Sequence, residues 1–264
     1  MERCILVITA TLGTRDTLRR TVESVKKIGG KYVNHVIVAP NVVIPKLQRE
    51  YPDLEFLEEP EGKKGIYPAI NYGFYTYGHD YKYLTFINDD DYWLPDYALL
   101  INYIVNHEEI DFVYGRTLYV DENNTRISEQ TSSCQFYSFL SLLRSNIVLL
   151  TQQATILKSS FYFRIGGFDE GFQLVADTKF WVELSLIKPK FKYFNHLCAA
   201  YMVQDGQLSS NKELSYKEHN SLIALFDDVN IIKLKVFIDK ILYRLINIRI
   251  YVNRLFRCRI HAPL

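Results

Sequence analysis

The first 120 residues alternate between short apolar runs and longer segments in which hydrophobic residues recur every three or four positions. The apolar runs predict buried strands, and the longer spacing predicts amphipathic helices. Strands are expected at residues 4–9, 33–39, 55–57, 83–87 and 112–114, and helices at 14–27, 44–51, 66–77 and 95–106. Repeated strand–helix units predict an α/β fold with a mostly parallel sheet covered by helices on both faces.

The second half of the chain is less regular. Helices are expected at residues 137–144 and 175–186, strands at 154–158 and 191–194, and a final helix at 230–257. The length of 264 residues and the 48% hydrophobic content are sufficient for one sizeable domain with an appendage.

Charge divides the chain unevenly. From residue 230 to the end there are eight Lys or Arg and one acidic residue, Asp239, which gives this segment +7 and the rest of the chain −6. Nucleic-acid binding is not expected, because the basic residues lie in a single amphipathic helix beside an acidic body. A basic amphipathic helix is typical of contact with an anionic membrane surface. Packing on the main domain and formation of a homo-oligomer stay open as alternatives.

Neither a signal peptide nor a membrane span is evident. The apolar run at residues 4–8 is too short for either. The four cysteines, Cys4, Cys134, Cys198 and Cys258, are far apart and have no zinc or redox spacing. The expectation is a cytoplasmic protein whose basic helix lies peripherally on the inner face of the cytoplasmic membrane.

An acidic cluster follows the strand predicted at residues 83–87. It consists of Asn88, Asp89, Asp90 and Asp91. Ligands of α/β sheets bind beyond the carboxyl ends of the strands. Three adjacent carboxylates repel one another unless a cation neutralises them, and their oxygens suit Mg²⁺ or Mn²⁺, which also bind phosphate. The alternative is a solvated acidic turn that caps the next helix.

Six segments, in this order along the chain, resemble family 2 glycosyltransferases, which have the nucleotide-sugar-binding GT-A fold. They are VIT at 7–9 with Arg15, GIYPAINYG at 65–73, FINDDDYWLP at 86–95, FVYG at 112–115, QQAT at 152–155, and GGFDE at 166–170 with ADTKFWVEL at 176–184. The resemblance covers roughly residues 4 to 210 and implies a GT-A (Rossmann-like) central sheet flanked by helices, with a C-terminal helical extension. The expected catalytic domain is 1–215, with a nucleotide-sugar half at 1–115 and an acceptor half at 116–215. The expected extension is 216–264.

The resemblance also implies roles for individual residues. Asp90 is expected to bind Mn²⁺ or Mg²⁺, and Asp177 to be the catalytic base that takes a proton from the acceptor hydroxyl. The residues expected to bind the donor or its nucleotide are Thr9, Arg15, Asn41, Asn71, Gly73, Asn88, Asp89 and Asp91. Gln153 and Trp93 are expected to contact the acceptor or the donor.

The implied reaction is the inverting, metal-dependent transfer of a sugar from a nucleotide-sugar donor, with a UDP-hexose as the expected one. The implied acceptor is a glycan or a lipid-linked saccharide, in the synthesis of a bacterial surface polysaccharide such as lipopolysaccharide or capsule. Two residues depart from the family pattern. Asn41 stands where the family often has an acidic residue that holds the nucleobase, and Asn88 replaces the first Asp of the acidic motif. A sugar nucleotidyltransferase and a catalytically degenerate sugar-binding or scaffold protein therefore stay open as alternatives.

Overall fold

The computed structural model describes residues 4–63, 65–204, 207 and 211–258. Within these residues nine strands form one sheet, in the order β3-β2-β1-β4-β8-β6-β9-β5, with β7 paired to β6. The strands are β1 (Ile5–Ala10), β2 (Val33–Ala39), β3 (Glu55–Glu58), β4 (Tyr83–Phe86), β5 (Tyr92–Trp93), β6 (Phe112–Val120), β7 (Arg126–Glu129), β8 (Thr155–Lys158) and β9 (Phe191–Met202).

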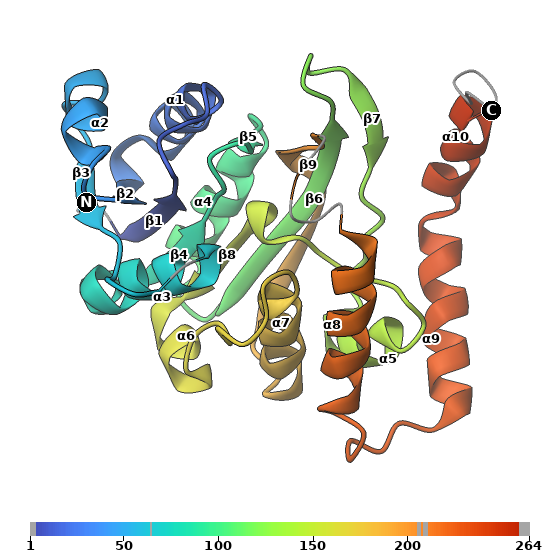
Figure 1. Cartoon of the computed structure of the whole chain (residues 1–264). Helices are drawn as coiled ribbons and strands as arrows, with labels where there is room; N and C mark the ends of the chain where they lie inside the picture. The colour runs from blue at the N-terminus through green and yellow to red at the C-terminus, as the bar shows by residue number, and fades with distance from the viewer. Residues whose placement is uncertain (1–3, 64, 205–206, 208–210, 259–264) are drawn as a thin grey trace.

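Helices cover the sheet (Figure 1). They are α1 (Leu18–Gly29), α2 (Ile44–Glu50), α3 (Ile66–Tyr77), α4 (Tyr97–Asn106), α5 (Phe139–Leu143), α6 (Ser159–Ile165), α7 (Ala176–Leu186), α8 (Lys212–Ala224), α9 (Lys233–Ile246) and α10 (Ile248–Cys258). Short 3₁₀ helices occur at Gly30–Tyr32, Gly78–Asp80, Phe136–Ser138 and Gln152–Ala154. No helix among the described residues is long and apolar enough to cross a membrane.

The predicted α/β architecture is confirmed. Strands β3, β2, β1 and β4 are parallel neighbours, so their carboxyl ends meet at one edge of the sheet. On the other side of β4 the sheet is mixed, because β8 is antiparallel to both β4 and β6, whereas β9 is parallel to β6. The carboxyl edge of the parallel half is where the acidic cluster lies.

Helix α1 begins at Leu18, four residues later than predicted. Its buried Leu18, Val22 and Val25 pack against the sheet as the apolar spacing predicts. The preceding loop is not helical because Gly13 has a left-handed φ of +70° and donates its N–H to the Thr11 hydroxyl. This leaves the polar side chains of the loop free to reach the acidic cluster.

Strands β6 and β9 extend well beyond the predicted 112–114 and 191–194. They approach closely at Gly115, where an added Cβ would lie 2.4 Å from the Cys198 sulfur. The register shifts on either side of Arg116, which allows the pairing to continue as far as Met202. The sequence prediction stopped early because polar residues interrupt the apolar run of β9. The extra length of β9 delivers Met202 to the acidic cluster.

The helix predicted at 230–257 is two helices, separated at Asn247. The side chain of Asn247 is buried, accepts the Ser132 N–H at 3.1 Å and donates to the Tyr243 carbonyl at 2.9 Å. These bonds hold the chain against the body and interrupt the helix. Helix α8 was not predicted, and it spans the expected boundary between residues 215 and 216. In Figure 1, α9 and α10 lie one above the other, on the side of the molecule opposite α1 and α2.

Candidate functional site

The acidic cluster lies directly after β4, beside the loop that follows β1. Thr11 and Arg15 come from that loop, and both contact the cluster. Because β1 and β4 are parallel neighbours, their following loops necessarily share one edge of the sheet. The fold therefore assembles the site from segments about 75 residues apart, as the sequence pattern predicted.

Asp91 is the buried support of the cluster, with none of its surface exposed. One carboxylate oxygen accepts from the Gln153 amide at 2.6 Å and the Asn88 amide at 3.1 Å. The other accepts the Met202 N–H at 2.9 Å. Burial, and secondly the charge of Asp90, raise the pKa of Asp91 well above its ordinary value. Because all of these contacts lie in the interior, Asp91 holds Asn88, Gln153 and Met202 in place beneath the exposed part of the cluster.

Asp89 and Asp90 share one cation, the guanidinium of Arg15. The Arg15 Nη1 atom lies 3.1 Å from an Asp89 oxygen and also hydrogen-bonds Asp90. The second oxygen of Asp89 accepts the Thr11 hydroxyl at 2.6 Å. Burial raises the pKa of Asp89, although the Thr11 hydroxyl and Arg15 oppose this effect. Arg15 thus supplies part of the positive charge that three adjacent carboxylates require.

The hydrogen bonds of Asp90 fall on one of its oxygens, whereas both oxygens of Asp89 and of Asp91 accept hydrogen bonds. The Oδ2 of Asp90 accepts from Arg15 and, at 3.1 Å, from the Gln207 amide. Within the described residues no group of three or more His, Cys, Asp or Glu side chains is arranged to hold a metal ion. Mg²⁺ and similar ions do not require three protein ligands, because they are commonly bound by one or two carboxylates together with substrate phosphates. The Oδ1 of Asn88 is buried and has no hydrogen-bond partner among the described residues, so the oxygens present fit a hard divalent cation.

Asp177 lies in the first turn of α7, as predicted for that helix. Its Oδ1 accepts the Thr178 N–H at 2.7 Å and the Tyr67 hydroxyl at 3.2 Å. Burial raises the pKa of Asp177 from 3.8 to about 6, although these hydrogen bonds oppose the shift. A carboxylate with a pKa close to the working pH is suited to accept a proton. Tyr67 lies in the first turn of α3, which follows β3, so Asp177 is held at the same edge of the sheet as the acidic cluster.

Glu218 of α8 holds the loop that leads into α7. Its two carboxylate oxygens accept the backbone N–H groups of Gln173, Leu174 and Val175 at 2.8, 2.8 and 3.2 Å. Tyr67 reinforces the same loop by donating to the Leu174 carbonyl at 3.1 Å. Glu218 is only 7% exposed, so these bonds lie in a region of low dielectric and restrain the loop strongly.

Replacement of Glu218 by Gln is expected to lower the free energy of unfolding by about 2 kcal/mol, because the amide group turns N–H donors toward backbone N–H donors. The catalytic activity expected from the sequence should fall as well, because the loop that precedes Asp177 loses its restraint. Denaturant unfolding and steady-state kinetics measure the two effects. The control is Glu213→Gln, since Glu213 is exposed in the first turn of the same helix. Equal losses in both variants would contradict the role given to Glu218.

Asn71 and Gly73 on α3 have structural contacts in this fold. Asn71 donates to the Phe168 carbonyl at 2.8 Å and to Glu170 at 3.1 Å, and its oxygen accepts the Phe168 N–H at 2.9 Å. It therefore ties α3 to the GGFDE segment. A Cβ at Gly73 would lie 2.9 Å from the Ile8 side chain, so glycine is needed where α3 packs on β1. A contact of either residue with the donor stays a prediction.

The other predicted contact residues differ in how accessible they are. Gln153 is 1% exposed and supports Asp91, with its Oε1 unpartnered among the described residues. Trp93 is a core residue: it is 2% exposed and its ring stacks on Tyr97 at 3.8 Å, which leaves no ring surface for a ligand. Thr9 is also buried and bonds His35 at 2.9 Å, whereas Asn41 is exposed at the carboxyl end of β2.

Sequence reasoning did not identify Thr11, Tyr67, Gln207 or Glu218 as parts of the site. Thr11 and Tyr67 lie inside or beside the segments that carry the family resemblance, so their positions offered a signal. Gln207 and Glu218 lie outside those segments. Nothing in the local pattern marks either residue, because each reaches the site only through the tertiary fold.

The fold is an α/β sheet with an acidic cluster beyond the carboxyl ends of its parallel strands. The sequence matches the family described as glycosyl transferase family 2 over residues 6–169, which is more than half of the chain. The chain belongs to this family, so the predicted resemblance is confirmed. No curated protein matches the sequence.

Several solved structures share the fold. A fragment of TarS from S. aureus, residues 1–349 in complex with UDP-GlcNAc, has a TM-score of 0.63 and 13% identity, covering 84% of this chain and 66% of that one. The mannosyltransferase PcManGT from Pyrobaculum calidifontis, in complex with GDP-Man and Mn²⁺, has a TM-score of 0.59 and 12% identity, covering 100% and 77%. This chain spans 43% of a longer TarS structure. At these identities the likeness establishes the fold alone.

Proposed function

We propose that the protein is an inverting, metal-dependent glycosyltransferase that uses a nucleoside-diphosphate sugar. The observation that carries the proposal is Asp177, a half-buried carboxylate with a pKa of about 6, held by Tyr67 at the sheet edge that bears the acidic cluster. Family membership and the neighbouring complexes with UDP-GlcNAc and GDP-Man support a nucleotide-sugar donor. A UDP-hexose is the first candidate, and a GDP-sugar is the second.

In the proposed reaction, the acceptor hydroxyl oxygen forms a bond to the anomeric carbon as the bond from that carbon to the diphosphate oxygen breaks. Asp177 takes the hydroxyl proton, and the nucleoside diphosphate leaves with the electron pair of the broken bond. Arg15 lies at the acidic cluster, where its charge is available to the diphosphate. Asp90, with Asn88 beside it, would hold Mn²⁺ or Mg²⁺. A divalent ion bound there stabilises the negative charge of the departing diphosphate.

The proposed acceptor is a saccharide or a lipid-linked saccharide in the synthesis of a bacterial surface polysaccharide such as lipopolysaccharide or capsule. Leu12 and Val42, on the loops that follow β1 and β2, are 64% and 88% exposed and are available to contact an acceptor at this edge of the sheet. The family match does not support the alternative function, that of a sugar nucleotidyltransferase.

The direct test is incubation of the full chain with Mn²⁺ and a panel of UDP-, dTDP- and GDP-sugars, with nucleotide release as the measurement. Release from only one class of nucleotide would identify the nucleobase of the donor. Addition of candidate saccharide and lipid-linked acceptors should then increase that release and yield a product with inverted anomeric configuration, which NMR detects. Absence of binding and release with every donor would remove the proposal.

A further inference from the structure

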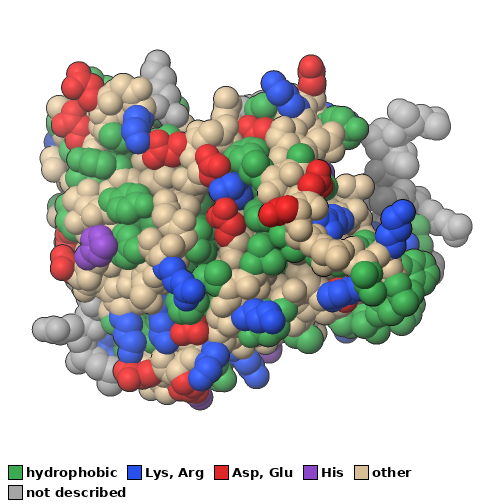
Figure 2. All heavy atoms as spheres, turned by 90° about the horizontal axis from the view of Figure 1, so that it is seen from below, with side chains coloured by type: hydrophobic (Ala, Val, Ile, Leu, Met, Phe, Trp, Pro, Cys, Tyr) green, Lys and Arg blue, Asp and Glu red, His purple; other side chains and the backbone are tan. Residues whose placement is uncertain are grey.

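The outward face of α9 and α10 is a continuous apolar surface, which we call the apolar stripe. It comprises Leu234, Phe237, Ile241, Leu245, Ile248 and Leu255, which follow one another at intervals of three, four or seven residues. Their side chains are 38% to 70% exposed. Figure 2 shows hydrophobic side chains gathered at the right edge of the molecule, over the lower end of α9, with Lys and Arg side chains bordering them. Large exposed apolar areas on a folded protein mark interaction sites.

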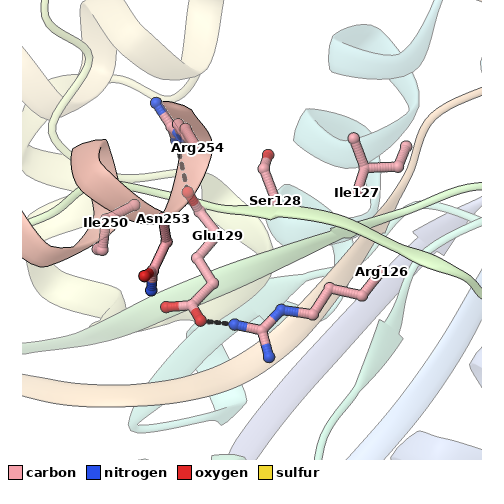
Figure 3. Close-up of a pocket in the computed structure, with 7 residues that line it drawn as sticks. All are labelled: Arg126, Ile127, Ser128, Glu129, Ile250, Asn253 and Arg254. Carbon is pink, nitrogen blue, oxygen red and sulfur yellow. Dashed lines mark hydrogen bonds and ion pairs between the residues drawn. The ribbon is translucent and has the colours of Figure 1, made fainter. Parts of the chain in front are cut away.

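The inward face of the same helices is polar. Tyr243 donates to the Thr131 carbonyl at 2.6 Å, and Asp239 is buried in an ion pair with Lys235. Arg254 of α10 donates to the Glu129 carbonyl at 2.5 Å, beside a small cavity of about 30 Å³ between β7 and α10 (Figure 3). The helices contact the rest of the domain through these polar groups and through the ring of Tyr243, which belongs to the hydrophobic core. Most of their aliphatic side chains stay exposed, unlike those of an ordinary surface helix.

The charge around the apolar stripe is entirely positive. Lys233, Lys240, Arg244 and Arg249 lie on these two helices, and among the described residues no carboxylate pairs with them. The single acidic residue of this segment, Asp239, is buried on the inward side. A groove of about 630 Å³ lies at one side of the stripe. Its lining includes the stripe residues Leu245 and Ile248, and also Arg244, Ser145 and Asn146. The complementary partner is therefore both apolar and anionic.

A second copy of this chain fits these features poorly. In a parallel pairing of two α9–α10 segments through the stripe, Arg244 of one copy would meet Arg249 of the other, because these positions are five residues apart on the flanks of the seam. Antiparallel pairing also brings basic flanks together, and neither arrangement supplies a carboxylate. The apolar area is also wider than a coiled-coil seam, since Leu242 and Ile246 beside it are 48% and 54% exposed.

We propose that α9 and α10 dock the enzyme on an anionic lipid surface. The apolar stripe enters the boundary between headgroups and acyl chains, and the four cations contact the anionic headgroups. Neither helix is long and apolar enough to cross the bilayer, so the helices lie along its surface. The polar inward contacts keep the catalytic body on the aqueous side.

The experiment is flotation of the full chain with vesicles of phosphatidylcholine alone and with phosphatidylglycerol added. The wild-type chain is expected to float with the anionic vesicles. Lys240→Gln with Arg244→Gln is expected to reduce partitioning about 30-fold, from the loss of two cations near the surface. Phe237→Ser with Ile241→Ser is expected to reduce it about 100-fold, from the loss of apolar burial. The measurement requires no donor or acceptor, so its outcome is independent of the proposed reaction.

Matched controls are Lys27→Gln with Lys31→Gln, at the end of α1, and Leu186→Ser with Tyr216→Ser, which removes two exposed hydrophobic side chains elsewhere. Both should float as the wild type does. Circular dichroism confirms that each variant is folded. The proposal is overturned if the wild-type chain does not float with anionic vesicles, or if both stripe variants float to the same extent as the wild type. A dimer in sedimentation experiments that Phe237→Ser with Ile241→Ser dissociates, without vesicle binding, would assign the stripe to a second copy.

Discussion

Asp177→Asn is expected to lower the rate of sugar transfer about 1,000-fold, because the amide cannot accept the acceptor proton. The amide oxygen still accepts from Thr178 and Tyr67, so the loop and the donor affinity should change little. In the wild type, kcat/KM is expected to fall as the pH drops below about 6, where Asp177 becomes protonated. Steady-state kinetics over a pH series measure both effects, with the exposed Asp228→Asn as the control. A wild-type rate for Asp177→Asn would show that another group is the base.

The same substitution is expected to stabilise the fold at neutral pH. The folded-state pKa of about 6 lies above the ordinary value of 3.8, so folding favours the protonated carboxyl. Its stabilising contribution is fully present below pH 3.8 and is lost as the pH rises through 6. Asp177→Asn should therefore raise the free energy of unfolding at pH 7.5 by about 2 to 3 kcal/mol and give no advantage below pH 4. Denaturant unfolding at the two pH values measures the difference.

Asp90→Asn is expected to weaken metal-dependent donor binding by at least about 100-fold, because the neutral amide cannot balance the charge of a divalent cation. Thermal stability should not fall, since the substitution removes a charge that repels Asp91. Calorimetric titration with the donor, with and without Mn²⁺, measures the effect. Asp96→Asn is the control, because Asp96 is an exposed carboxylate nearby that pairs with His196. Equal donor affinity of the wild type with and without Mn²⁺ would contradict the role of Asp90.

The acidic cluster, Asp177 and the parallel half of the fold could be predicted because their signals are local. Asn88 to Asp91 follow an apolar strand directly, and Asp177 lies within a segment that resembles the family. Helix α3 was predicted at its observed bounds, Ile66–Tyr77, since its apolar positions face the sheet along its whole length.

Other features depend on contacts between distant residues, and no local pattern contains them. Glu218 supports the Asp177 loop from 41 residues away along the chain, and only the packing of α8 brings it there. The resemblance implied that Trp93 contacts the acceptor or the donor, but the sequence did not reveal that its ring stacks on Tyr97 and is 2% exposed. The division of the last helix at Asn247 likewise follows from a bond to Ser132, which the helical periodicity does not reveal.

The position of Glu218 decides where this enzyme can be shortened. Cutting the chain at the expected domain boundary after residue 215 would divide α8 and remove the carboxylate that restrains the Asp177 loop. Loss of activity in such a fragment would then say nothing about the role of α9 and α10. A cut after Asp228 retains the whole of α8 and removes α9 and α10 together. The chain that ends at Asp228 is therefore the one that tests catalysis apart from the lipid docking proposed for α9 and α10.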